Sequence, residues 1–347
     1  MRWSYNLERS YSTAVWLFAI AAMVLAMVVV GGATRLTGSG LSIVEWRPVT
    51  GVIPPMNDTA WATEFAKYQH IPQYRLVNAG MGVGQFKTLY WWEWGHRLLG
   101  RLLGVVFFVP FVGLLAFRRL PKRLIWRCVA IFALGGLQGF VGWWMVSSGL
   151  QDRVSVAPER LALHLGLALL TLMACVWTGL EAWFGRARPG GYPADPLWMR
   201  GAVGLVVLVF FQILLGALVA GNQAGRIYTD WPLMDGRFIP ALYGQKGQGL
   251  WSIVAHSQAA VQFNHRMVGY LLLASAIAYF IGLAKAHAPE RPKALALLLM
   301  AAVMVQAMLG ILTLKLATPL ALGLLHQLGA AAVLTIALTL AWRVRRA

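Results

Sequence analysis

The sequence predicts an all-α integral membrane protein with eight transmembrane helices, built as two four-helix bundles. The 347 residues are 59% hydrophobic and only 12% charged, and the mean hydropathy is +0.63. This composition is typical of polytopic membrane proteins and not of soluble domains. Apolar stretches of about 20 residues, the length that crosses a bilayer as a helix, recur along the chain, and landmarks of the first half return in the second.

Eight apolar stretches are long enough to span a membrane. In chain order, the predicted spans are residues 14–33, 90–117, 124–147, 161–184, 201–221, 260–284, 294–314 and 320–342. No small-residue cleavage site follows the first stretch, so we expect it to stay in the mature protein as the first span.

The distribution of basic residues predicts the orientation of these spans. Placing alternate loops on one side gathers there more than half of the 30 Lys and Arg residues but only a third of the 12 Asp and Glu residues. By the positive-inside rule this side is cytoplasmic, and both termini lie on it. The net charge of +18 is therefore spread over short loops and tails, and we expect no nucleic-acid partner.

The two halves repeat one another. The third span reads Leu-Gln-Gly-Phe-Val-Gly from Leu137, and the seventh reads Val-Gln-Ala-Met-Leu-Gly from Val305. Both halves begin inside and hold four spans, which predicts parallel repeats about an axis along the membrane normal. The predicted units are residues 1–184 and 185–347.

Two long outer loops, residues 34–89 and 222–259, follow the first and fifth spans. In the longer loop Trp61, Phe65 and Tyr68 recur at helical spacing, which indicates an amphipathic helix. We expect it to lie on the membrane surface with its aromatic rings at headgroup level. Both loops are expected to cover the outer mouths of the bundles.

Four histidines lie near the outer ends of alternate spans, within the first two predicted turns of each. They are His96, His164, His265 and His326. Ionisable side chains are costly in a bilayer and normally face a bundle interior. Neutral imidazole is a standard axial ligand of haem iron, and helix bundles hold cofactors between facing side chains. Zinc, copper or di-iron sites want more ligands than each pair offers, so the pattern predicts two porphyrin sites.

Glu93 distinguishes the first half from the second. It precedes His96 by one helical turn on the same face, whereas Gln262 stands at the matching place before His265. A carboxylate at one site and an amide at the other favour acid–base or oxygen chemistry in the first half only. The alternative is that Glu93 pairs with Arg97 or with solvent.

Arg97 and Arg266 each follow a predicted ligand directly in the chain. As bidentate donors they would suit haem propionates at the outer surface. They would equally suit lipid phosphate, reached by snorkelling. The sequence leaves both interpretations open.

Several segments resemble the haem A synthase family. They begin at Gly31 (Gly-Gly-Ala-Thr-Arg-Leu-Thr-Gly-Ser-Gly-Leu-Ser), Glu93 (Glu-Trp-Gly-His-Arg-Leu-Leu-Gly-Arg), Asp230 (Asp-Trp-Pro-Leu-Met) and Leu325 (Leu-His-Gln). Some members carry paired cysteines in their outer loops. The two cysteines here, Cys128 and Cys175, fall in apolar spans. The chain therefore resembles the cysteine-lacking branch shared by proteobacteria and mitochondria.

The resemblance implies an oxidoreductase that converts the methyl group of haem O to the formyl group of haem A. The reaction proceeds by successive hydroxylations to a geminal diol that loses water. Carried over by position, His96 and His164 flank the substrate haem and Glu93 is the catalytic carboxylate. His265 and His326 would ligate a permanent haem b that passes electrons.

The resemblance also implies a location and partners. We expect a multi-pass protein of the bacterial inner membrane, with haem sites near the periplasmic face. Expected partners are haem O, haem A, membrane lipids, an electron-transfer partner, haem O synthase and cytochrome oxidase assembly factors, with a homo-oligomer left open. Two alternatives keep the four histidines but do not need Glu93. They are a di-haem b-type membrane electron carrier and a haem-binding chaperone or transporter without chemistry.

Overall fold

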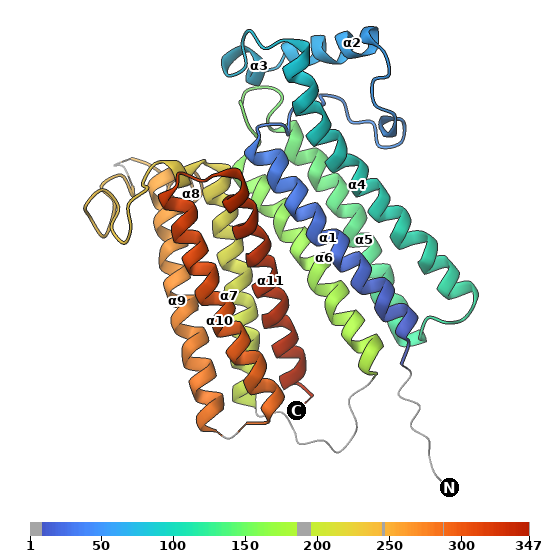
Figure 1. Cartoon of the computed structure of the whole chain (residues 1–347), viewed down its shortest axis with the longest axis vertical. Coiled ribbons are helices and arrows are strands. Elements are labelled where there is room, and N and C mark those ends of the chain that lie inside the picture. Colours follow the sequence, from blue (N-terminus) through green and yellow to red (C-terminus); the bar gives the residue numbers. More distant parts are fainter. Residues whose placement is uncertain (1–8, 186–195, 245–246, 287, 347) are drawn as a thin grey trace.

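The computed structural model describes residues 9–185, 196–244, 247–286 and 288–346. Across these residues the chain is helical and contains no strand, only one isolated β-bridge between Met234 and Arg237. Eight helices are long and apolar enough to cross a membrane (Figure 1). This confirms the predicted all-α class and the number of spans.

In the described residues, short helices lie in two of the loops between the membrane-length helices, those that follow α1 and α7. The long helices are α1 (Tyr11–Leu36), α4 (Val83–Ala116), α5 (Lys122–Ser147), α6 (Pro158–Phe184), α7 (Pro196–Gly221), α9 (Gln258–Lys285), α10 (Glu290–Lys315) and α11 (Leu320–Val344). The short ones are η1 (Thr50–Val52), α2 (Asp58–Gln69), α3 (Pro72–Leu76), η2 (Ala224–Arg226) and α8 (Leu250–His256).

The helix ends follow local capping chemistry. The Ser10 side chain accepts a hydrogen bond from the Thr13 amide at the start of α1, and Ser257 does the same for Ala260 at the start of α9. Proline at the first position begins α6 and α3, where its missing N–H costs no helical hydrogen bond.

One predicted boundary is wrong. Helix α4 begins at Val83, well before the predicted residue 90, so His96 lies in about its fourth turn and not within the first two. The sequence pattern marks only the apolar part of a helix. The first turns of α4 carry Gln85 and Lys87 and are stabilised by contacts with the outer loop.

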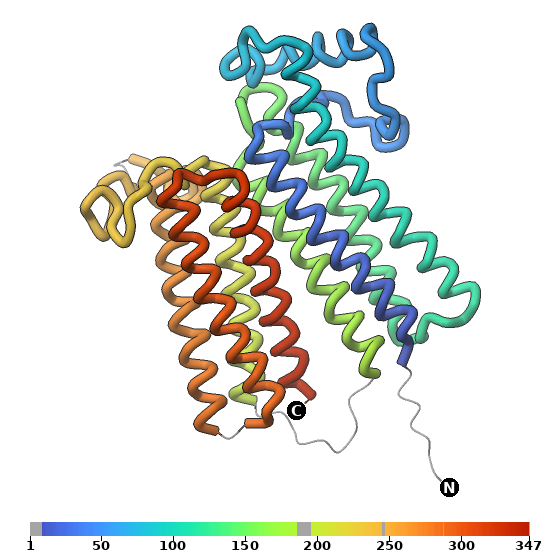
Figure 2. Tube along the Cα trace, viewed as in Figure 1, coloured from blue at the N-terminus to red at the C-terminus, as the bar shows by residue number. Residues whose placement is uncertain are grey.

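Each half closes into a ring of four helices (Figure 2). In the first half α1 packs against α4 and α6, and α5 packs against the same two helices. In the second half α7 and α10 each pack against α9 and α11. Helices α4 and α6 therefore lie diagonally opposite one another, as do α9 and α11.

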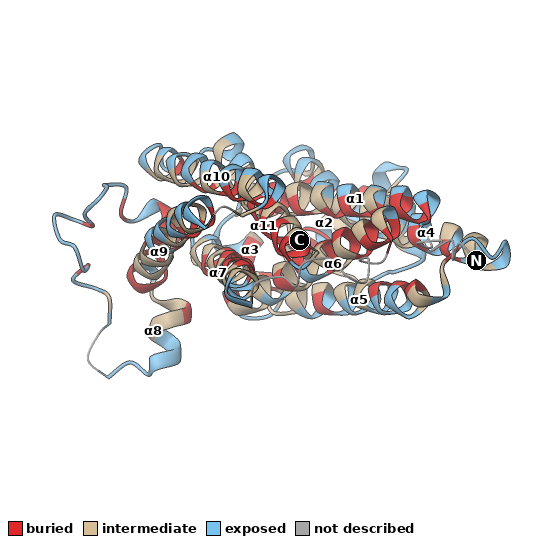
Figure 3. Ribbon diagram, turned by 90° about the horizontal axis from the view of Figure 1, so that it is seen from below, coloured by how far each residue is buried: buried red, intermediate tan, exposed pale blue. Residues whose placement is uncertain are grey.

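The halves meet through α1 and α6 on one side and α7 and α11 on the other. Viewed along the helices in Figure 3, α6 and α11 lie in the middle of the molecule, with α5 and α9 toward opposite flanks. One hydrophobic core cluster runs through both halves and includes both free cysteines, Cys128 and Cys175.

The end at which α1 begins and α11 ends is called here the inner end (Figure 1). There the Glu181 carboxylate of α6 is buried, with 5% of the residue exposed. It pairs with Arg345 of α11 and with Arg123 of α5, the latter at 3.5 Å. This network joins the two halves where their cores end.

The opposite, outer end of the first half carries a cap made of α2, α3 and the first turns of α4. Trp61 and Tyr68 of α2 pack against Phe86 and Tyr90 of α4, and Tyr68 and Phe86 are fully buried. The prediction that the α2 aromatics lie at headgroup level is therefore wrong. The early start of α4 supplies an apolar partner, so these rings pack within the protein.

Candidate functional site

The two histidines of the second half face each other across the middle of their bundle. His265 lies on α9 and His326 on α11, and their ring centroids are 6.4 Å apart with the planes at 81°. Two imidazoles binding one metal from opposite sides need about 2 Å per bond and about 1 Å from each nitrogen to its ring centre, or about 6 Å in all. The observed separation fits a bis-imidazole site.

The two histidines of the first half occupy the matching places. His96 lies on α4 and His164 on α6, and the two are close enough for their charges to interact. In the part of the chain that the structure describes, they do not make the ring-to-ring contact that joins His265 and His326.

Two of the four imidazoles carry a nitrogen that a ligand could bind. The Nδ1 atoms of His164 and His265 are buried and have no hydrogen-bond partner. Buried polar atoms are rarely left unpaired. Together with the ring separation in the second half, this supports the residues as holders of a metal-centred group.

Each histidine ring packs against a glycine of a neighbouring helix. In the first half, a Cβ atom at Gly31 would lie 3.0 Å from Cε1 of His96, and one at Gly142 would lie 2.9 Å from Cε1 of His164. In the second half, a Cβ atom at Gly216 would lie 3.1 Å from Cε1 of His265, and one at Gly310 would lie 2.8 Å from Cε1 of His326. These distances are too short for a side chain to fit without displacing the ring. In the sequence, Gly142 and Gly310 are recognisable only as landmarks of the repeat.

Glutamines support three of the same histidines through the backbone. Gln138 donates to the His164 carbonyl at 3.0 Å, and Gln306 donates to the His326 carbonyl at 2.6 Å. Gln212 donates to the His265 carbonyl at 2.9 Å. A buried carbonyl that accepts a second hydrogen bond fixes the helix turn carrying its imidazole.

Glu93 is buried, with 4% of the residue exposed, and its carboxylate is fully engaged. One oxygen accepts from Arg97 at 2.6 Å. The other accepts from the Ser42 hydroxyl at 2.8 Å and the Ile43 amide at 2.9 Å. The ion pair that the sequence left as an alternative is therefore present, and it adds a hold on the outer loop.

Arg97 and Arg101 extend this hold along the same face of α4. Arg97 donates to the carbonyls of Ile43 and Glu45 at 2.8 and 2.9 Å. Arg101 donates to the carbonyls of Pro48 and Arg47 at 2.8 Å each. We call Glu93, Arg97 and Arg101, spaced four residues apart, the first clasp.

The second half has a counterpart on α9, the second clasp, formed by Gln262, Arg266 and Tyr270. Gln262 donates to the carbonyls of Ala224 and Tyr228 at 2.8 and 3.2 Å. Its oxygen accepts from Arg266, which also donates to the Leu233 and Tyr228 carbonyls. The Tyr270 hydroxyl accepts a hydrogen bond from the Trp231 indole N–H at 2.9 Å.

The two clasps explain part of the contrast between Glu93 and Gln262. The first loop presents donors, the Ser42 hydroxyl and the Ile43 amide, which need an acceptor. The second presents carbonyl acceptors, which need a donor. Both guanidiniums already bind loop carbonyls, and the propionate role of Arg97 and Arg266 stays a prediction.

A polar cavity missed by the sequence analysis opens at the outer end between α5 and α6. Its volume is about 390 Å³, and it is lined by Ser147, Ser148, Gln151, Asp152, Arg153 and Arg160. Arg160 stacks on the Trp144 ring at 4.1 Å and stands one turn before His164 on the same face of α6. Its spacing from His164 was the signal available in the sequence.

This fold and site define a class of protein: a polytopic membrane helix bundle with a pair of histidines on diagonally opposite helices of each half. A family model described as cytochrome oxidase assembly protein (COX15-CtaA) matches residues 14–338. The chain belongs to this family. The family predicted from the sequence motifs is thereby confirmed.

Similar proteins carry one name. The "Heme A synthase" of Caulobacter sp. strain K31 is 56% identical over 98% of both chains. That of Paracoccus denitrificans is 49% identical over 93% of this chain and 85% of its own. That of Parvibaculum lavamentivorans is 46% identical over 97% and 94%.

Proposed function

We propose that the protein is a haem A synthase, an oxidoreductase that converts the methyl group of haem O to the formyl group of haem A. The observation that carries the proposal is the duplicated pair of histidines on diagonally opposite helices, whose ring centroids are 6.4 Å apart in the second half. Relatives of the chain bear that name over nearly their full length. Two porphyrin sites are what a substrate haem and an electron-passing haem require.

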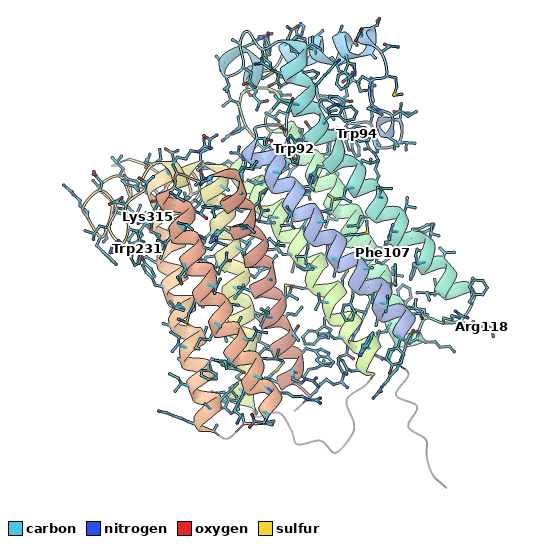
Figure 4. All side chains as sticks on the ribbon, viewed as in Figure 1. Trp92, Trp94, Phe107, Arg118, Trp231 and Lys315 are labelled. Carbon is cyan, nitrogen blue, oxygen red and sulfur yellow. The ribbon has the colours of Figure 1, made fainter. Side chains whose placement is uncertain are left out.

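The halves would be parallel repeats, residues 1–184 and 185–347, in the inner membrane with both termini cytoplasmic. Figure 4 agrees with this arrangement in that Arg118 lies at the inner end and Trp231 lies at the outer end of the second half. Basic residues favour the cytoplasmic side and tryptophans favour the interface. The histidines would then stand toward the periplasmic face.

In the second half His265 and His326 would hold haem b, which supplies one-electron transfer when bound. The close ring contact suits a resident group. In the first half His96 and His164 would flank haem O as substrate.

Glu93 would act on the substrate from the first clasp. Its hydrogen bonds from Arg97, Ser42 and Ile43 hold the carboxyl group in one orientation. A carboxylate held in one orientation near the reacting methyl group can accept a proton as each hydroxylation proceeds and as the diol loses water. The outer loop that it binds would exclude bulk water from the same mouth.

The reaction requires an electron-transfer partner, which would be reached through the haem b half. Haem O synthase would deliver the substrate, and cytochrome oxidase assembly factors would receive the product. The apolar surfaces of α4 and α5 would contact membrane lipid.

A second function, a di-haem b-type electron carrier, is favoured by one observation. The two clasps are alike in position and contacts, so Glu93 does not require chemistry to account for its presence. A haem chaperone would share this feature.

The test is chromatography of haems extracted from a host that makes haem O but no haem A, with and without the protein. Appearance of haem A or its hydroxylated intermediate supports the synthase. Haem O left unchanged beside protein-bound haem b supports the carrier. If the protein is a synthase, the Glu93→Gln variant should keep its haem b and lose turnover. If the protein is an electron carrier, the same variant should keep full electron transfer.

A further inference from the structure

The residues that support the histidines form one repeated pattern. Helices α5, α7 and α10 each carry a glutamine followed four residues later by a glycine: Gln138 and Gly142, Gln212 and Gly216, Gln306 and Gly310. We call this Gln-x-x-x-Gly pair a cradle. Residues four apart lie one turn apart on the same helix face, so both members of a cradle meet the same neighbouring helix.

The two members of a cradle act on different parts of the histidine. The glycine admits the imidazole edge, because a Cβ atom there would lie 2.8–3.1 Å from its Cε1 atom. The glutamine holds the histidine carbonyl, at 2.6–3.0 Å. In the α5 cradle, Gln138 Nε2 also lies 3.4 Å from a ring nitrogen of His164. In the α10 cradle, Gln306 Nε2 lies 3.0 Å from a ring nitrogen of His326. Ring and backbone are thus fixed together.

The fourth cradle, on α1, lacks its glutamine. Gly31 admits the His96 ring, but Met27 stands one turn before it. Met27 occupies the place in the first half that Gln212 occupies in the second. The Met27 methyl group lies 3.6 Å from the position that a Cβ atom of Gly100 would take, and Gln212 Nε2 lies 3.2 Å from the position that a Cβ atom of Gly269 would take. Gly100 and Gly269 each follow their histidine by four residues.

The consequence falls on His96. Among the described residues, no side chain donates to its carbonyl, whereas the other three histidine carbonyls accept from a glutamine. A thioether offers no donor. His96 is also in the pair that makes no ring-to-ring contact.

We infer that the Gln-x-x-x-Gly cradles lock His164, His265 and His326 as positioning devices, and that Met27 leaves His96 as the ligand that yields when a porphyrin enters or leaves the first half. The inference rests on the proposed function, because it assigns the exchangeable site to the substrate half. Met27 and the three glutamines are positioning residues, since they act through the histidines.

The first experiment exchanges the fourth cradle. Met27→Gln, Met27→Leu and Gln212→Met variants are purified with the haems they carry, and porphyrin transfer to excess apomyoglobin is followed by absorbance. Chromatography of the haem remaining at each time identifies which porphyrin has left. Met27→Leu is the matched control because it keeps the volume but adds no donor.

Met27→Gln is expected to slow loss of haem O or haem A about fivefold to tenfold, the effect of one added neutral hydrogen bond, with haem b loss unchanged. Gln212→Met is expected to accelerate haem b loss by a similar factor. Equal release rates for Met27→Gln and Met27→Leu, or unchanged haem b release in Gln212→Met, would overturn the inference.

The second experiment replaces the cradle glycines with alanine. Because alanine is a better helix former than glycine, any loss in these variants comes from the contact between the added methyl group and the histidine ring. Gly216→Ala should lower the ratio of haem b to protein and alter its low-spin electron paramagnetic resonance signal. Gly204→Ala, on the same helix with nothing near its Cβ position, should change neither. Gly142→Ala and Gly139→Ala form the same comparison for first-half haem.

Failure of the inference differs from failure of the proposed function. If His265→Ala and His326→Ala lose haem b while the cradle variants match wild type, only the cradles are wrong. If the histidine variants and wild type carry equal amounts of haem, the proposed haem sites themselves are wrong.

Discussion

At the scale of single residues, the first clasp shows how one side chain can serve structure and chemistry together. Glu93 is 4% exposed and accepts from three donors, and a buried charge so placed depends on each of them. The Ser42 hydroxyl is the one donor that can be removed without touching the carboxylate or its ion pair. It separates the structural role from the catalytic one.

Ser42→Ala removes one hydrogen bond to a charged acceptor and should destabilise the outer loop by about 1.5–3 kcal/mol. Because Arg97 and the Ile43 amide still hold the carboxylate, haem A formation should fall far less than in Glu93→Gln. Thermal melting and haem extraction from the same preparations measure both effects. Equal losses of activity in the two variants would mean that Glu93 acts only by holding the loop.

At the scale of elements, the cap over the first half depends on the outward extension of α4. Phe86 is fully buried, and its ring meets those of Phe65 and Tyr68 at 5.2 Å each. Three rings of α2, those of Trp61, Phe65 and Tyr68, contact the Phe86 ring. The cap and the first clasp both fix the loop that follows α1, so weakening the cap should leave this loop held by the first clasp alone.

Phe86→Ala should destabilise the cap by about 3–5 kcal/mol, the range for removing a buried aromatic ring, and should speed proteolysis between residues 37 and 82. Phe117→Ala, at the far end of the same helix, changes a residue that is 78% exposed and should have little effect. Cleavage rates followed by mass spectrometry give the comparison. Equal cleavage of the two variants would show that the cap does not depend on Phe86.

The same cap contains a titratable ion pair outside the membrane-spanning segments. Lys67 lies 3.0 Å from Glu45, and its hydrogen bond is the largest cause that holds the pKa of Glu45 below its ordinary value, with Arg47 contributing. A lowered folded-state pKa stabilises the fold above the ordinary glutamate pKa of about 4.3, and the stabilisation is lost as pH falls through the lowered value.

The difference in melting temperature between wild type and Glu45→Gln should therefore be largest at neutral pH and should shrink on acidification below about pH 4. The effect is small because the Glu45 side chain is 40% exposed and surface pairs are screened. A difference that grows on acidification would contradict the assignment.

At the scale of the whole molecule, polar contacts at both ends join the halves around a common core. At the inner end Glu181 of α6 pairs with Arg345 of α11. Toward the outer end Gln327, next to His326, donates to the Val28 carbonyl of α1 at 2.9 Å, and Arg35 of α1 donates to the Gly221 carbonyl of α7 at 3.1 Å. Helix α1 thus carries Gly31, which packs against the His96 ring, and also contacts the helices of the second half.

Glu181→Gln removes the carboxylate that pairs with Arg345 and Arg123 and should lower stability by about 3 kcal/mol, because removing one partner of a buried ion pair is strongly destabilising. Arg345→Gln should cost less, since its side chain is 42% exposed. Melting followed by intrinsic fluorescence and by haem absorbance should show both halves affected together. Loss confined to one half would mean that the halves unfold independently.

The sequence alone determined the all-α membrane class, the eight spans, the four histidines and the family, because apolar length and residue type are local properties of the chain. It did not predict the early start of α4, since that start depends on Phe86 meeting the rings of α2. It noted Gln138 and Gly142 without their role, because a cradle exists only once α5 lies beside α6. The loop contacts of Glu93 and the missing donor at Met27 were decided by tertiary structure, since both depend on which backbone groups another segment brings within hydrogen-bond distance.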